Sequence, residues 1–170
     1  MAEKLVVIDM QNDFIDGALA NPAAKAIIPR VNELIAQARA NGTQVIFTQD
    51  THAAPDHYLQ TSEGKHLPIP HCEFGTHGWE ISPELDKQNG DLFVLKNFFA
   101  YDKWRAILQP GDHVTVCGVV TSICVAANVS VMKAIPYVEV TVVRDATADL
   151  SNELKEAAIK VMQAQQAEVI

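Results

Sequence analysis

The sequence has few basic residues, few cysteines and no long apolar run, and each shortage excludes a class of protein. Only 13 Lys and Arg stand against 21 Asp and Glu, which gives a formal net charge of −8. The sequence contains no stripe of basic residues that could bind a phosphate backbone, so we expect no nucleic-acid partner. Apolar runs such as Leu5 to Ile8 are far too short to cross a bilayer, so we expect no membrane partner.

Cysteine is present only at Cys72, Cys117 and Cys124, with no CxxC or zinc-finger spacing. Together with the lack of a signal-peptide pattern at residues 1–4, this predicts a cytoplasmic protein without a disulfide framework. Neither GxGxxG nor GxxxxGK[ST] occurs, which argues against nucleotide binding by those loops. Any cysteine chemistry must therefore come from a single thiol whose partners are brought to it by the fold.

Histidine, by contrast, is concentrated in one part of the chain. Five of the six histidines lie within residues 52–77, and only His113 lies outside. Residues 50–90 also hold four of the eight prolines and four of the eight glycines, with little periodicity. Because a long irregular segment inside a compact domain is usually functional, we expect this one to carry part of a site.

The order of apolar patterns predicts the fold class. Short β-rich runs alternate with segments of helical period, and a chain of 170 residues suits a single domain, residues 1–170. We expect strands at residues 4–9, 44–48, 91–95, 113–117, 138–143 and 168–170, and helices over about 23–40, 121–134 and 151–164. This pattern predicts a doubly wound α/β fold, with a mainly parallel six-stranded sheet between helices on both faces in three layers, α/β/α.

Reactive side chains end several of the expected strands, where ligands bind in open α/β sheets. The first strand ends at Asp9, the third ends at Lys96, and Cys124 lies in the first turn of the helix after the fourth. The helix N-terminus favours a thiolate, a carboxylate can take a thiol proton, and an ammonium stabilises a developing oxyanion. Each residue also has a structural alternative. Asp9 could cap a turn, Lys96 could be a solvated strand end, and Cys124 could be a small residue of the apolar core.

A second group of candidates begins at the end of the second strand. Asp50, His52, Glu63 and His71 supply two imidazoles and two carboxylates, a set suited to one divalent ion, Zn, Fe or Mn. His57 is the substitute if Glu63 is not a ligand, and a solvated polar loop is the structural alternative. The other nearby candidates are expected to bind no metal: His66, His77 and Cys72.

Five motifs, in order over nearly the whole chain, resemble the isochorismatase-like cysteine hydrolases and, within them, the nicotinamidase/pyrazinamidase branch. Residues 9–14 resemble D-x-Q-N-D-F, residues 50–52 resemble D-x-H, and residues 70–76 resemble P-H-C-x-x-G-T. Lys96 and Asn97 match the catalytic lysine region, and residues 118–125 resemble G-V-x-T-D-x-C-V. Each motif is short, but together they are specific for this superfamily.

The resemblance implies a catalytic triad of Asp9, Lys96 and Cys124. It also implies an oxyanion hole formed by the backbone amides of Val120 and Cys124, and a cis peptide before Val120. The implied reaction is the deamidation of a small carboxamide, first of all nicotinamide to nicotinate and ammonia, through a thioester on Cys124. A role in pyridine nucleotide salvage and a homo-oligomeric state are further expectations from the family.

The resemblance also implies that Asp50, His52, His71 and Glu63 hold the metal ion. This ion would bind the pyridine nitrogen of nicotinamide. Two positions depart from the family pattern: Ser122 stands where the family usually has Asp, and Pro68 replaces an aromatic residue that flanks the ring. Phe14 remains as a ring contact. The candidates for the missing aromatic face are Phe98, Phe99, Tyr101 and Trp104.

These departures leave two alternatives open. The first is an isochorismatase-like hydrolase that acts on another small amide, a carbamoyl compound or a ureide, favoured by Pro68 and Ser122. The second is a relative that has lost catalysis and binds a metal or a ligand. In this alternative, Ser122 in place of the usual Asp indicates the loss. For the enzyme, the expected partner is a small-molecule amide substrate.

Overall fold

The computed structural model describes all 170 residues and contains one six-stranded sheet in which every neighbouring pair of strands is parallel. The strand order is β3-β2-β1-β4-β5-β6, so the chain winds outward in both directions from β1 and β4. The predicted doubly wound fold is therefore confirmed. The strands are β1 (Glu3–Ile8), β2 (Gln44–Asp50), β3 (Leu92–Lys96), β4 (His113–Val119), β5 (Glu139–Ala148) and β6 (Glu168–Val169).

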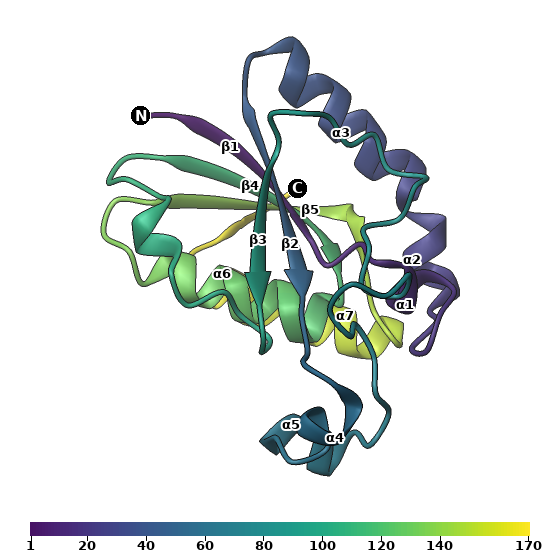
Figure 1. Cartoon of the computed structure of the whole chain (residues 1–170). Helices are drawn as coiled ribbons and strands as arrows, with labels where there is room; N and C mark the ends of the chain where they lie inside the picture. The colour runs from purple at the N-terminus through teal and green to yellow at the C-terminus, as the bar shows by residue number, and fades with distance from the viewer.

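Helices cover both faces of the sheet, with α3 on one side and α6 and α7 on the other (Figure 1). Two short helices, α4 and α5, lie beyond the carboxyl ends of β2 and β3 (Figure 1). None of the helices combines the length and the apolar character that a membrane span requires. The helical elements are α1 (Asn12–Ile15), α2 (Pro22–Ala26), α3 (Ile28–Ala40), α4 (Pro55–Tyr58), α5 (Ser62–His66), the 3₁₀ turn η1 (Trp104–Ala106), the π-helical turn η2 (Thr121–Val125), α6 (Ala126–Lys133) and α7 (Asn152–Ala164).

The core consists of two apolar layers that sandwich the sheet. Along β1, Leu5 and Val7 point into the layer under α3, whereas Val6 and Ile8 point into the layer under α6 and α7. Each layer contains 19 buried residues, so both faces of the sheet are covered except at the edge strand β3, where Phe93 and Leu95 are exposed. A ligand therefore reaches the centre of the sheet only at its ends.

Two of the expected helices are built differently from the prediction. The helix expected over 23–40 is split at Ile27, because Pro29 has no N–H to continue the hydrogen-bond ladder of α2 and instead begins α3. The helix expected from residue 121 begins as the π-helical turn η2 before it becomes α6. At α7 the prediction is accurate, since Ser151 caps the helix by accepting from the Leu154 amide.

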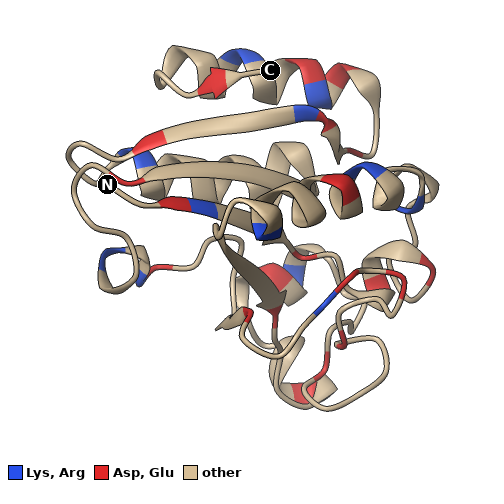
Figure 2. Ribbon diagram, turned by 90° about the horizontal axis from the view of Figure 1, so that it is seen from above, with Lys and Arg blue, Asp and Glu red and all other residues tan.

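Charged residues are scattered over many elements of the ribbon (Figure 2). Exposed pairs such as Arg30 with Asp145 and Arg144 with Glu156 contribute little to stability, because solvent screens them. The exception lies at the carboxyl end of the sheet, where ionisable side chains are buried together.

Candidate active site

The carboxyl ends of four neighbouring strands bring Asp9, Asp50, Lys96 and Cys124 together. Asp9 directly follows β1, Asp50 and Lys96 are the last residues of β2 and β3, and Cys124 lies in η2 after β4. All four are buried, and Asp9 is fully inaccessible to solvent. Since parallel strands end at the same edge, the strand order alone accounts for this meeting.

Lys96 is at the centre of this group. Its Nζ lies 2.7 Å from Oδ2 of Asp9 and 3.7 Å from Sγ of Cys124. The same nitrogen lies 3.3 Å from Oδ1 of Asp50 and donates a hydrogen bond to the carbonyl of Phe98 at 3.0 Å. A buried ammonium is stable only with such partners, so Lys96 holds the two carboxylates and the thiol in one cluster.

Burial is the largest influence on the thiol of Cys124. Burial raises its pKa well above the usual value; Lys96 opposes the rise and Asp9 adds to it. That the helix N-terminus favours the thiolate of Cys124 stays a prediction. Burial also raises the pKa of Asp9, against the effect of Lys96. For Lys96, burial would lower the pKa, but its acidic neighbours raise it, so the ammonium persists.

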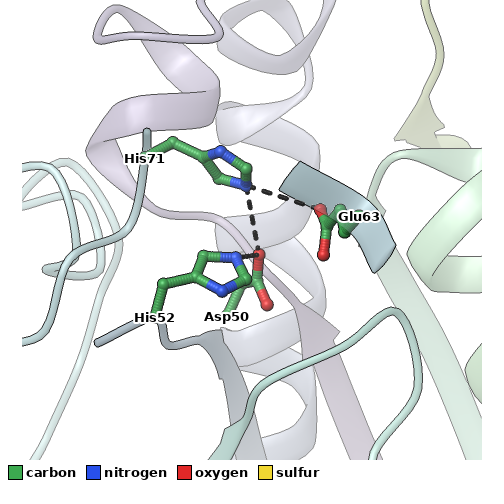
Figure 3. A group of neighbouring side chains, drawn as sticks. All are labelled: Asp50, His52, Glu63 and His71. Atoms are coloured by element: carbon green, nitrogen blue, oxygen red, sulfur yellow. Dashed lines mark hydrogen bonds and ion pairs between the residues drawn. The ribbon is translucent and has the colours of Figure 1, made fainter. Parts of the chain in front are cut away.

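The second group contains Asp50, His52, Glu63 and His71, and each residue directs one ligand atom to a common point (Figure 3). These four atoms lie within 4.8 Å of one another. Nε2 of His52 and Nε2 of His71 lie 3.0 and 3.4 Å from Oδ2 of Asp50, and Nε2 of His71 lies 3.7 Å from Oε1 of Glu63. His57 is not part of the group, so Glu63 is the fourth member.

The four residues fit a divalent metal ion. Nδ1 of His71 lies 2.8 Å from the carbonyl of Ile69; with Nδ1 as the donor, the lone pair of Nε2 points inward, as in most metal-bound histidines. Oε2 of Glu63 is buried without a hydrogen-bond partner. Although burial opposes it, the pKa of Asp50 is lowered by Lys96 and His52, so this carboxylate is ionised. Two imidazoles and two carboxylates suit Zn, Fe or Mn.

The remaining histidines of the 52–77 segment lie apart from this group. Nδ1 of His66 bonds the carbonyl of Ser62 within α5, and His77 is exposed beside Glu80. Cys72 is a buried thiol, and burial raises its pKa far above the usual value.

Polar side chains just after β1 fix the segments that carry the ligands. The Gln11 side chain accepts from the Asp50 amide at 2.7 Å and donates to the Asp50 carbonyl at 2.8 Å. Oδ2 of Asp13 accepts from the amide of Cys72 at 2.7 Å, next to His71. The sequence marked these residues only as parts of a motif, whereas the structure shows that they tie the 50–72 segment to the sheet.

Both groups open into one cavity of about 800 Å³. Its lining includes Cys124, Val120, Phe14 and Phe99, and the peptide between Val119 and Val120 is cis. Phe98 also lines the cavity, but Tyr101 and Trp104 do not. Trp104 is instead fully buried, with its Nε1 donating to Asn128 at 2.8 Å, and Tyr101 packs against it.

Ser122, the departure from the family pattern, has a partner of its own. Its amide and its hydroxyl both donate to the carboxylate of Asp149, at 2.6 and 3.0 Å. A serine can donate to Asp149, whereas an aspartate at this position would place two carboxylates against each other. The pairing shows how serine fits at this position.

The fold and the site define a class of α/β proteins with an acid, a lysine and a cysteine at the carboxyl edge of a parallel sheet, beside a four-ligand group. Residues 3–170 match the isochorismatase domain family. The chain belongs to this family.

Named relatives resemble the chain over nearly its full length. The nicotinamidase/pyrazinamidase of Mycobacterium tuberculosis is 28% identical, covering 98% of this chain and 97% of the relative. A probable inactive nicotinamidase of Arabidopsis thaliana is 31% identical, covering 91% of this chain and 85% of the relative. The crystal structure of the Pyrococcus horikoshii pyrazinamidase in complex with zinc superposes with a TM-score of 0.86 and 28% identity, covering 100% of this chain and 99% of that one.

Proposed function

We propose that this chain is a metal-dependent cysteine amidohydrolase that deamidates a small carboxamide, in the first place nicotinamide, to the acid and ammonia. Its family and its nicotinamidase relatives make it an amide hydrolase. The observation that carries the proposal is the contact of Lys96 with both Asp9 and Cys124, beside a four-ligand group in the same cavity.

The first step is proton transfer from the thiol. Because the pKa of Cys124 is raised by burial, the thiol needs a base, and Asp9, which interacts with both the thiol and Lys96, is the carboxylate that can serve. As Asp9 takes the proton, Sγ of Cys124 attacks the carbonyl carbon of the amide. The ammonium of Lys96 stabilises the negative charge that develops during this step.

The next steps release ammonia and restore the enzyme. In our proposal, the backbone amides of Val120 and Cys124 hold the oxyanion of the tetrahedral intermediate. The carbon–nitrogen bond breaks as Asp9 returns its proton to the leaving nitrogen, which leaves a thioester on Cys124. Water, deprotonated by Asp9, then hydrolyses the thioester to the acid and the free thiol, so the net reaction consumes one water and releases one ammonia.

The four-ligand group orients the substrate in this proposal. When bound, a divalent ion held by Asp50, His52, Glu63 and His71 would supply a Lewis acid for a ring nitrogen of the substrate. Phe14 lies beside this group, with its ring 5.7 Å from that of His71 in an edge-to-face arrangement. We assign Phe14 and Phe99 to the walls that contact the ring.

The proposal has three further parts. A cytoplasmic location rests on the cysteine usage, whereas a role in pyridine nucleotide salvage and assembly into a homo-oligomer rest on the family resemblance. Light scattering of the purified protein tests the last part, because a monomer at working concentration would contradict it.

Ammonia release from a panel of small amides tests the proposal. The panel contains nicotinamide, pyrazinamide, N-carbamoyl amino acids and ureides, and we expect nicotinamide to give ammonia and nicotinate. Trapping at acid pH should show a mass adduct on Cys124. Release only from carbamoyl compounds would favour the alternative substrate class. No release, together with Cys124 that resists iodoacetamide, would identify a decayed relative.

A further inference from the structure

The cavity is larger than nicotinamide requires. Its volume is about 800 Å³. Nicotinamide has about nine heavy atoms, and at the ~30 Å³ that liquid water allots to each molecule these would occupy roughly a third of that space. Cavities of this size commonly bind larger organic molecules. The substrate at this site therefore has room to extend beyond a single ring.

Most ionisable residues that line the cavity lie close to one another. Asp50, Glu63 and His71 belong to the four-ligand group, and the polar Ser62 and His66 come from the same helix as Glu63. In the proposed function, a ring nitrogen and the amide of a substrate face this group and Cys124.

Much of the remaining lining is apolar and includes Leu19, Ile123, Leu150, Phe98 and Phe99. Asn21, a polar residue of the remaining lining, already has hydrogen-bond partners at both ends of its side-chain amide, which accepts from the Ala23 amide and donates to the Asp149 carbonyl. A substituent that points away from the four-ligand group would therefore meet carbon rather than hydrogen-bonding groups.

From this division we infer that the preferred substrate is a primary carboxamide whose ring carries an apolar substituent, with Leu19, Ile123 and Leu150 as the residues that select it. The inference rests on the proposed function. Each methylene buried against these side chains should raise kcat/KM about fourfold, because burial of a methylene contributes about 0.8 kcal/mol.

A series of ring-substituted nicotinamides tests this inference. We expect kcat/KM to rise from nicotinamide to its methyl and propyl derivatives at ring carbon 5, which is bonded neither to the ring nitrogen nor to the carbon that carries the amide, and to fall for a hydroxymethyl derivative at the same carbon. Leu150→Ser should reduce the ratio of propyl to unsubstituted kcat/KM about tenfold, whereas the ratio should persist in Leu154→Ser, at a leucine that is exposed as Leu150 is but lies outside the cavity. If nicotinamide is hydrolysed but the series is flat or falls, the inference is wrong and the proposed function stands. If no compound releases ammonia, the proposed function itself is wrong.

An independent observation concerns Asp9, whose backbone is held in an unusual conformation. Its φ is 50°, in the left-handed region that residues other than glycine rarely adopt. Its amide donates to Oγ1 of Thr48 at 3.1 Å, and the Thr48 hydroxyl donates in turn to Oδ1 of Asp9 at 2.6 Å. Thr48, which is fully buried in β2, therefore holds both the backbone and the carboxylate of Asp9.

The geometry assigns Thr48 the role of a positioning residue for Asp9. With Oδ1 held by the hydroxyl, Oδ2 faces Lys96 at 2.7 Å. The charged and titratable groups around Asp9 are Lys96 from β3, Cys124 from η2, Asp50 from β2 and Cys72 from the segment before β3. Thr48 is the neutral donor among them, and its hydrogen bond favours the ionised carboxylate that the proposed reaction needs.

The isosteric variant Thr48→Val tests this role. We expect kcat to fall about 10- to 100-fold with KM nearly unchanged, since a hydrogen bond to a charged group is lost. The acid limb of the dependence of kcat on pH should move to higher pH. Thr48→Ser should restore both the value of kcat and the position of this limb. Thr141→Val, at a buried threonine of β5, is the matched control and should keep both. A Thr48→Val protein with altered stability but unchanged kcat and limb, or a Thr48→Ser protein as impaired as Thr48→Val, would overturn the assignment.

Discussion

The two halves of the site are built by different parts of the chain. The half with Asp9, Lys96 and Cys124 uses three strand ends or the turn directly after one, so the sheet register sets its distances. The four-ligand half takes only Asp50 from a strand end and its other members from the long segment before β3. The first half is thus positioned by the backbone ladder, whereas the second depends on side-chain hydrogen bonds.

The halves share one carboxylate. Oδ1 of Asp50 lies 3.3 Å from Nζ of Lys96, and Oδ2 lies 3.0 Å from Nε2 of His52. Variants on either side of Asp50 should therefore separate the two halves, and a variant of Asp50 itself should damage both.

The largest effect is expected from Cys124→Ala. Amide hydrolysis should fall about 10⁴-fold or more, because the attacking atom is lost, while about one equivalent of metal should still bind. Ammonia release and metal analysis of the same preparation measure the two halves separately. Cys117→Ala, at a buried thiol of the apolar core, is the control and should remain active. An active Cys124→Ala protein would contradict the covalent mechanism.

Asp50→Asn should have the next largest effect. Loss of the negative charge weakens the metal group and also removes one partner of Lys96, so we expect a fall in kcat/KM of about 10²- to 10³-fold. Both metal content and the rate of Cys124 alkylation should change. If only the metal content changes, the two halves are independent, and the statement that they share Asp50 functionally is wrong.

His71→Ala isolates the four-ligand half. Changes in residues that merely support a metal ligand typically cost 10- to 100-fold in affinity, so removal of a ligand should cost at least about 100-fold. Titration with Zn²⁺ measures this loss, and Cys124 alkylation in the metal-free variant should match that of the metal-free parent protein. His77→Ala, at an exposed histidine outside the group, is the matched control.

The pH dependence isolates the other half. Burial raises the pKa of Asp9 above its ordinary value of 3.8, so the carboxylate is lost at a higher pH than usual as the solution is acidified. In metal-free protein, alkylation of Cys124 should therefore slow as the pH falls through this raised pKa. An alkylation rate that does not change across the acid range would exclude Asp9 as the base.

The smallest effect is expected at Ser122. Ser122→Ala removes one of its two hydrogen bonds to Asp149, which should cost about 1 kcal/mol and lower the Tm by about 2–4 °C, with activity nearly unchanged. Ser122→Asp should cost more, because it adds a carboxylate next to Asp149. A thermal scan compares the two variants, and equal Tm values would contradict the pairing described here.

The contrast between the halves also explains what could be predicted from sequence. The strand ends were predictable, since alternating strands and helices imply a parallel sheet whose carboxyl ends meet, and Asp9, Lys96 and Cys124 follow from that order. From the sequence, Glu63 could be named only as one of two alternatives with His57, because the path of residues 53–70 depends on tertiary hydrogen bonds. Thr48 gave no signal, since a threonine inside a β-rich run is typical of any strand.

Local structure was missed where one residue overrides a pattern. The apolar spacing over 23–40 is helical throughout, but Pro29 divides it into α2 and α3. The π-helical turn at Cys124 has no sequence signature that separates it from the start of an ordinary helix.

The shared carboxylate of Asp50 also couples the two halves, and such a coupling is reciprocal by thermodynamic linkage. If metal binding changes the affinity of the Cys124 side for a reversible inhibitor or substrate fragment by some factor, occupation of that side must change the metal affinity by the same factor. A reagent attached to Cys124 thus becomes a probe of metal affinity, and the metal becomes an effector of the thiol.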